Sequence, residues 1–191
     1  TPFEGVISSS IAFSDVDGDG DEDVLITGRS GPEERIAKLY TNEGGSFTEV
    51  AGTPFEGVSN GSVAFADVDG DGDNDVLITG GNVSDEPITK LYTNNGGSFT
   101  EATGTLFEDV WYSSVAFSDV DGDGDQDVLI TGFNFSFERI AKLYTNEEGS
   151  FTEATGSPFD GVGTSSVAFS DVDGDGDNDL LITGRSGPEE R

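Results

Sequence analysis

A repeat of 52 residues is the feature that most constrains this chain. The segment DVDGDGDEDVLITG begins at Asp15 and returns, with small changes, at Asp67, Asp119 and Asp171. A fixed period of this length is typical of proteins built from equal structural units, in which each unit completes its core against its neighbours. The period divides the chain into repeat 1 (1–52), repeat 2 (53–104), repeat 3 (105–156) and a partial repeat 4 (157–191).

Four short apolar segments in each repeat have the composition of β-strands. In repeat 2 they span residues 62–68, 75–80, 88–94 and 98–104. They are rich in Val, Ile, Thr, Phe and Tyr, they are separated by Gly, Asn and Asp, and none is long enough to show a helical period. The last two are joined by a glycine-rich turn, where positive φ angles are accessible. Each repeat is therefore predicted to be a four-stranded antiparallel meander.

A single meander of this size cannot bury both of its faces, so we expect neighbouring repeats to stack face to face, as the blades of a β-propeller do. The predicted fold is all-β and propeller-like, with tandem four-stranded antiparallel blades that make three full blades and a half blade. The aromatic residues that recur at equivalent positions are expected in the core between the sheets. They are Phe3, Phe55, Phe107 and Phe159; Phe13, Phe65, Phe117 and Phe169; Tyr40, Tyr92 and Tyr144; and Phe47, Phe99 and Phe151.

The sequence ends inside the fourth repeat, after two of its four strands. The second of these strands would be left as an open sheet edge, which is a template for pairing with another chain. Three explanations remain open: the chain is a piece of a longer propeller, it assembles with other copies, or it belongs to a long open array. Because the first residue is Thr1 and not an initiator methionine, we also expect a processed form or an excerpt.

The most informative motif is the acidic loop between the first and second strands of each repeat. In residues 15–23, carboxylates occupy every second position, and two carboxylates 4 Å apart repel each other by about 4 kcal/mol at an effective dielectric near 20. Such a cluster needs a cation, and oxygen donors without nitrogen or sulfur favour Ca²⁺ over the more demanding Mg²⁺. An EF-hand is excluded because its twelfth position, a bidentate Glu, is here Ile26.

In the first loop, we expect metal ligands from the side chains of Asp15, Asp17, Asp19 and Asp23 and from the backbone carbonyl of Asp21. The same pattern recurs in every repeat and predicts one Ca²⁺ per repeat, four in total. The corresponding residues are Asp67, Asp69, Asp71, Asp73 and Asp75; Asp119, Asp121, Asp123, Asp125 and Asp127; and Asp171, Asp173, Asp175, Asp177 and Asp179.

The loop, followed by D-V/L-L-I-T-G and preceded by A-F-S/A-D, resembles the FG-GAP and VCBS-type repeats of integrin-like calcium-binding β-propellers. This resemblance covers the whole chain. It implies a propeller with Ca²⁺ in the hairpin between the first two strands of each blade, in secreted or cell-surface proteins that often serve adhesion or ligand recognition. The chain differs in that its repeats are unusually alike and fewer than most propellers of this type need to close.

Composition narrows the range of functions. Acidic residues outnumber basic ones 39 to 8, for a formal net charge of -31, so phosphate backbones and anionic lipid surfaces would be repelled. We therefore expect neither nucleic-acid binding nor membrane insertion. The sequence has no Cys and no His, which removes the usual nucleophiles, bases and zinc ligands. Because the clustered carboxylates are needed for metal, we also expect no enzymatic activity.

Differences among the repeats indicate where a partner could bind. The repeats diverge before the first strand and between the second and third strands, two connections expected on the edge opposite the metal loops. This edge carries a predicted aromatic cluster of Trp111, Tyr112, Phe133, Phe135 and Phe137. The alternative explanation of the divergence is neutral drift in exposed loops. Asn60, Asn82 and Asn134 each begin a weak glycosylation sequon in the same regions.

Two functions are consistent with these features. The first is a calcium-stabilised extracellular or cell-surface module for adhesion, with a protein or glycan as its ligand. The alternative is a structural repeat protein, in which further copies of the chain are the partner and stacking forms a calcium-stabilised fibre or surface assembly. The oligomeric state in calcium would separate the two.

Overall fold

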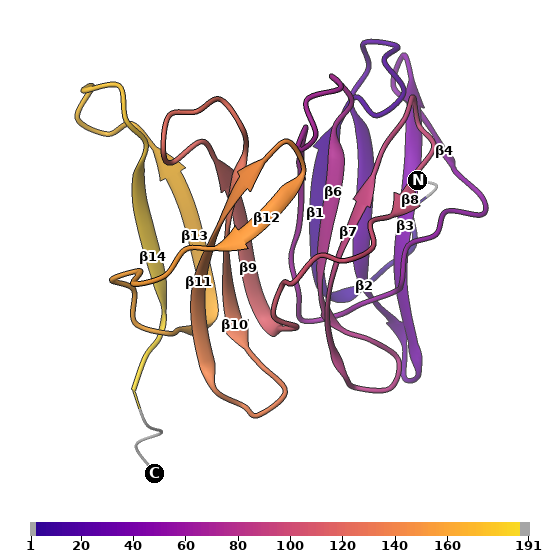
Figure 1. The fold of residues 1–191 in the computed structure, drawn as a ribbon. Helices are drawn as coiled ribbons and strands as arrows, with labels where there is room; N and C mark the ends of the chain where they lie inside the picture. The colour runs from indigo at the N-terminus through magenta and orange to yellow at the C-terminus, as the bar shows by residue number, and fades with distance from the viewer. Residues whose placement is uncertain (1–2, 188–191) are drawn as a thin grey trace.

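The computed structural model describes residues 3–187, and in this part of the chain all regular structure is β-strand (Figure 1). Three four-stranded antiparallel sheets and one two-stranded sheet follow each other in chain order, each a simple meander. We call them blades 1 to 4. The described residues contain no helix that could cross a membrane.

The strands recur at equivalent positions of the repeats. Blade 1 contains β1 (Ile7–Ser14), β2 (Asp23–Gly31), β3 (Glu34–Glu43) and β4 (Ser46–Glu49). Blade 2 contains β5 (Val63–Ala66), β6 (Asp75–Gly81), β7 (Pro87–Thr93) and β8 (Thr100–Glu101). Blade 3 contains β9 (Trp111–Ser118), β10 (Asp127–Phe133), β11 (Arg139–Glu147) and β12 (Ser150–Glu153), and blade 4 contains β13 (Gly163–Ser170) and β14 (Asp179–Arg185).

The two faces of each sheet carry different sets of apolar residues. In blade 1, Val24 lies opposite Phe13 and Tyr40, whereas Leu25 lies opposite Ala12 and Leu39. Residues directly opposite each other share a face, and successive residues of a strand point to opposite faces. We call the face with Val24, and its equivalents in other blades, the leading face, and the face with Leu25 the trailing face.

The sheets stack with the trailing face of each blade against the leading face of the next. Between blades 1 and 2, Leu25 and Leu39 share a core with Val76 and Tyr92. Between blades 2 and 3, the equivalent residues Leu77, Leu91, Val128 and Tyr144 form the same contact. Figure 1 shows the blades side by side from indigo to yellow, and they do not close into a ring. The predicted all-β fold of three full blades and a half blade is confirmed.

Serine hydroxyls connect the first strands of successive blades. The backbone N–H of Val63 donates to Ser10 Oγ at 3.2 Å, and the contact repeats from Val115 to Ser62 at 3.4 Å and from Val167 to Ser114 at 3.2 Å. The spacing of 53 residues in each pair shows that the blades are related by a regular operation. Each blade is thus fixed to the next by polar contacts as well as by apolar packing.

The recurring aromatic residues lie largely where the sequence predicts them. Tyr40, Tyr92 and Tyr144 are among the largest fully buried side chains. Each packs edge-on against a phenylalanine from the segment that precedes the blade, as Phe55 does with Tyr92 at 5.1 Å between ring centroids. Phe13 is different because it is 60 % exposed. It lies on the leading face of blade 1, where no earlier blade covers it.

The strand boundaries differ from the sequence-based expectation in several places. The fourth strand of repeat 2 was expected over residues 98–104, but β8 covers only Thr100–Glu101. The first strand of repeat 2 was expected to reach residue 68 but ends at Ala66, because Val68 turns inward at the start of the acidic loop, where it is 2 % exposed. The variable segments expected before the first strand are instead part of β1, β9 and β13. Each contains an irregularity in the pairing and a residue with positive φ, namely Ser8, Tyr112 and Thr164.

The equivalence of the blades allows a matched test of the stacking core. Leu77 is fully buried, whereas Leu181 occupies the same position in blade 4 and is 65 % exposed. Leu77→Ala is expected to lower the free energy of unfolding by about 2–5 kcal/mol, because it leaves a cavity between two sheets. Leu181→Ala is expected to change it by less than about 0.5 kcal/mol in dilute solution. Urea denaturation followed by tryptophan fluorescence and circular dichroism would measure both, and equal losses would contradict the stacking arrangement.

Candidate metal centre

Each acidic loop connects the first two strands of a blade, and in Figure 1 these loops lie at the upper edge of the array. Within the first loop, the carboxylate of the first aspartate organises the backbone. Asp15 Oδ1 accepts the N–H of Gly18 at 2.8 Å and that of Asp19 at 3.1 Å, while Oδ2 accepts the N–H of Gly20 at 2.9 Å. Gly18 and Gly20 have φ angles of 77° and 93°, which other residues adopt at a cost, so the loop requires glycine there.

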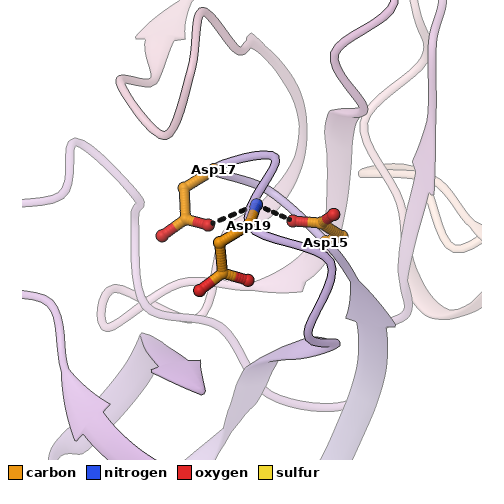
Figure 2. Close-up of side chains that lie close together, drawn as sticks. All are labelled: Asp15, Asp17 and Asp19. Atoms are coloured by element: carbon orange, nitrogen blue, oxygen red, sulfur yellow. Dashed lines mark hydrogen bonds between the residues drawn. The ribbon is translucent and has the colours of Figure 1, made fainter. Parts of the chain in front are cut away.

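The loop backbone brings three carboxylates together. Figure 2 shows Asp15, Asp17 and Asp19 around one point, with the Asp19 N–H donating to both of the other side chains. One oxygen from each lies within 4.8 Å of the others. Blade 2 has the same group, Asp67, Asp69 and Asp71, within the same distance. In blades 3 and 4 the aspartate at the ninth loop position takes the place of the one at the fifth, and the groups are Asp119, Asp121 and Asp127; and Asp171, Asp173 and Asp179. All four repeats therefore have an oxygen cluster that could hold a metal ion.

The aspartate at the ninth position of the loops in blades 1 to 3 has a second role that the sequence does not reveal. Asp75 is fully buried, and its two oxygens accept the backbone N–H of Val68 at 3.0 Å and that of Asn94 at 2.8 Å. It thus joins the acidic loop to the end of the third strand. Asp23 and Asp127 make the same pair of contacts in blades 1 and 3.

The electrostatic environment of this buried aspartate favours a bound cation. The pKa of Asp75 is raised to about 6, mainly by burial and also by the nearby charges of Asp69 and Asp71, while its two backbone hydrogen bonds act in the opposite direction. Burial likewise raises the pKa of Asp23 and of Asp127. A raised pKa means that the ionised carboxyl is disfavoured in the folded protein. A divalent cation in the loop would oppose this effect, because it stabilises the charged form.

The aspartate at the seventh loop position makes its contacts outside the cluster. Asp21 Oδ2 accepts the N–H of Gly44 at 2.6 Å, and Asp73 makes the same contact with Gly96 at 2.7 Å. These bonds tie the loop to the hairpin between the third and fourth strands. This geometry is compatible with the expectation that the seventh position would offer a metal its backbone carbonyl. The ligand assignment itself stays a prediction for all twenty aspartates.

A recurring asparagine couples the loops of blades 1 and 2 to the next blade, and sequence reasoning missed it. Asn94 Nδ2 donates to the backbone carbonyl of Val16 at 2.9 Å, and Asn146 Nδ2 donates to that of Val68 at 2.8 Å. Both asparagines are buried. The signal was present in the sequence, since asparagine is unfavourable in strands and recurs here at intervals of 52 residues.

The donor set fits a hard cation. The clusters offer carboxylate oxygens, as Ca²⁺ and Mg²⁺ require, and the chain has no thiol or imidazole to favour a softer metal. Three lysines neutralise glutamate side chains outside the acidic loops. Lys38, Lys90 and Lys142 each lie between two glutamates outside the loops, with N–O distances of 2.7–3.2 Å. The clustered aspartates therefore fit a metal, which would supply positive charge that binds the loop together.

The opposite edge of the array contains the predicted aromatic residues in two pairs. Trp111 packs on Phe137 at 5.2 Å between centroids, and Tyr112 meets Phe133 at 6.2 Å. Phe135, in the turn between β10 and β11, is 71 % exposed. A groove of about 250 Å³ runs beside the first pair and is lined by Arg35, Ser59, Asn60, Gly81, Asp85, Trp111, Tyr112 and Phe137.

In two of the three glycosylation sequons, the asparagine side chain forms hydrogen bonds within a turn. The Oδ1 atom of Asn82 accepts the N–H groups of Ser84 and Glu86, and that of Asn134 accepts those of Ser136 and Glu138. Both residues are less than 10 % exposed. These side chains stabilise turns, whereas Asn60 is half-buried.

Substitutions in one loop should separate metal binding from structural anchoring. Asp71→Asn keeps an oxygen for the Asp73 N–H at 2.9 Å but removes a charge from the cluster, so it is expected to weaken metal binding at that loop about tenfold or more. Asp75→Asn places an amide NH₂ against a backbone N–H, and it is expected to cost about 1–3 kcal/mol of stability even without metal. Calorimetric titration and metal-free melting would measure the two effects. Equal metal-free stability of the two variants would contradict the anchoring role.

Comparison with protein families matches the chain to the FG-GAP-like repeat over residues 15–78 and again over residues 67–130. Each match begins at the first aspartate of one acidic loop and ends in the strand that follows the next loop. The two matches together span more than half of the chain. A comparison with curated proteins gave no match. With its acidic loops between the first two strands of successive blades, this chain belongs to the FG-GAP-like repeat family.

Proposed function

We propose that the chain is a calcium-stabilised, non-catalytic binding module of an extracellular or cell-surface protein, which holds a protein or glycan ligand on the edge opposite its metal loops. The observation that carries this proposal is the fourfold repetition of the carboxylate cluster, with three oxygens within 4.8 Å of one another in every repeat. Because every repeat has such a site, we expect the sites to stabilise the array and not to form a single reaction centre.

Calcium is the proposed ion because the loops offer oxygen donors and no nitrogen or sulfur ligand. Ca²⁺ accepts six to eight oxygens in flexible geometry, whereas Mg²⁺ requires near-octahedral coordination and keeps more of its water. Extracellular modules commonly bind calcium at about 10⁻⁴ to 10⁻³ M, so their sites fill only where calcium is abundant. Four Ca²⁺ would offset eight of the 31 net negative charges.

The proposed ligand face combines exposed rings with hydrogen-bonding groups. Tyr112 and Phe137 are 47 % and 68 % exposed beside the groove, and the Arg35 guanidinium pairs with the Asp85 carboxylate at its other side. Aromatic rings next to charged and amide groups are typical of sugar contacts and of protein interface anchors. The metal loops lie at the opposite ends of the strands, so ligand and calcium would not compete.

A non-catalytic role is proposed because the loop carboxylates already have structural partners. The first and ninth positions of each loop accept backbone N–H groups within the same blade. Paired acids in a glycosidase need one free acid and one free base or nucleophile at the same site. The family is also one of repeat modules that bind or support, which agrees with this proposal.

The choice of metal has a direct test. Saturating Ca²⁺ is expected to raise the melting temperature well above the value in chelator, because an ion that binds only the folded state adds about 2.7 kcal/mol per site at a concentration 100-fold above its Kd. Mg²⁺ at the same concentration is expected to raise it less. Thermal melting by circular dichroism in Ca²⁺, Mg²⁺ and chelator gives the comparison, and identical melting curves in Ca²⁺ and chelator would refute the calcium proposal.

The ligand face can be tested with variants of the ring pair. Trp111→Ala and Phe137→Ala are each expected to weaken binding to an immobilised panel of glycans and extracellular proteins roughly tenfold or more, as for central interface anchors. Leu106→Ala is the control, since Leu106 is 82 % exposed outside the groove. Metal-dependent melting should be unchanged in all three variants. Wild-type binding that survives in both ring variants would place the ligand elsewhere.

A further inference from the structure

A buried series of hydrogen bonds connects the acidic loops of successive blades. In the loop of blade 1, the Val16 N–H donates to Asp23 Oδ2 at 2.9 Å, and the carbonyl of the same valine accepts from Asn94 Nδ2 at 2.9 Å. The backbone N–H of Asn94 in turn donates at 2.8 Å to Oδ1 of Asp75, which ends the loop of blade 2. Asn94 therefore contacts the loops of both blades.

The same contacts continue from blade 2 to blade 3. The Val68 N–H donates to Asp75 Oδ2 at 3.0 Å, and the carbonyl of Val68 accepts from Asn146 Nδ2 at 2.8 Å. The Asn146 N–H then donates to Asp127 Oδ1 at 2.8 Å. We call this series the asparagine relay, and none of its members is more than 3 % exposed. They are Val16, Asp23, Val68, Asp75, Asn94, Asp127 and Asn146.

The turn between the third and fourth strands of one blade also lies against the acidic loop of the preceding blade. A Cβ atom at Gly97 would lie 3.3 Å from the Cβ atom of Asp17, and one at Gly149 would lie 3.3 Å from that of Asp69. The relay asparagine shapes this turn, since Asn94 Oδ1 accepts the N–H of Gly97 at 2.9 Å. The aspartate at the third loop position is therefore in contact with the next blade.

The relay holds the backbone between two predicted metal ligands. Val16 lies between Asp15 and Asp17, and its carbonyl is fixed by Asn94. A loop that is already fixed loses less conformational entropy when its carboxylates close on an ion, so it binds the ion more tightly. A cation in the loop of blade 2 would stabilise the charge of Asp75 and strengthen its hydrogen bond with Asn94. An ion in one loop would therefore help to order the loop of the neighbouring blade.

We propose that calcium binding is positively cooperative between neighbouring blades and that Asn94 and Asn146 are the positioning residues that transmit this coupling. The inference rests on the proposed calcium binding and concerns its regulation. The loops fill together over a narrow range of calcium concentration, so that the array changes between a metal-free and a fully loaded form. Because coupling between two sites is reciprocal, each loop raises the affinity of its neighbour by the same factor.

The coupling is measured by weakening one loop and observing another. In a Ca²⁺ titration of the ¹⁵N-labelled chain followed by NMR, the amide of Gly20 reports on the loop of blade 1 and that of Gly72 on the loop of blade 2. Asp71→Asn in blade 2 is expected to raise the midpoint calcium concentration of Gly20 about fivefold or more. Asp19→Asn in blade 1 is expected to raise the midpoint of Gly72 by a similar factor.

Asn94→Ala breaks the relay between blades 1 and 2. In this background Asp71→Asn is expected to leave the midpoint of Gly20 nearly unchanged, and the four chains form a double-mutant cycle. Asn95→Ala is the matched control, because Asn95 is the exposed asparagine next to Asn94, and this variant is expected to retain the shift. The titrations are made at an ionic strength of about 0.15 M, where direct repulsion between bound ions is screened beyond about 8 Å.

Asn146→Ala gives an independent measurement, because it breaks the relay between blades 2 and 3. It is expected to abolish the effect of Asp71→Asn on the amide of Gly124, in the loop of blade 3, and to retain the effect on Gly20. Circular dichroism checks the folding of every variant. Midpoints that do not respond to Asp71→Asn, or that respond equally with and without the relay asparagines, would overturn the coupling and leave the calcium proposal standing. Loop amides that do not respond to Ca²⁺ at all would overturn both.

Discussion

Every feature of this protein depends on the packing of one sheet against the next. A four-stranded meander has two apolar faces, and Leu25 and Val24 show that successive residues of one strand serve different cores. No blade can bury both sets by itself, so the fold becomes an array in which each sheet completes its neighbours. The serine and asparagine contacts between blades fix the rotation from one sheet to the next. The same constraint explains why the faces at the two ends of the array are exposed.

The acidic loops concentrate negative charge at one edge of this array, and their aspartates lie in two different environments. The buried aspartate at the ninth loop position, such as Asp75, accepts hydrogen bonds from two backbone N–H groups and thereby holds the loop to the end of the third strand, although burial raises its pKa. In blades 1 and 2, the aspartates at the first, third and fifth loop positions remain near the surface with oxygens close to one point, as Figure 2 shows for the first loop. The loop therefore has a rigid base and an accessible tip, an arrangement that suits reversible binding of a cation.

The opposite edge varies more in sequence than the metal edge. The turns between the second and third strands differ in sequence, and those of blades 2 and 3 are held by Asn82 and Asn134, whose side chains cap the turn. The remaining side chains are free to vary without disturbing the sheets. Blade 3 places aromatic rings there, next to an ion pair that links Arg35 of blade 1 to Asp85 of blade 2. The edge proposed to bind a ligand is therefore the variable one, while the acidic loops at the other edge keep nearly one sequence.

The sequence by itself determined the architecture and the position of the clusters. The 52-residue period, the alternation of short β-segments and the aspartates at every second position of residues 15–23 were sufficient, because each is a local pattern repeated in every unit. Only the tertiary structure decided which aspartates are buried anchors, which face of each sheet meets the next blade, and that Phe13 and Leu181 are exposed while their equivalents are covered. The repeats are almost identical in sequence, so burial at a given position depends on whether a neighbouring sheet lies against it, and the local sequence does not contain that information.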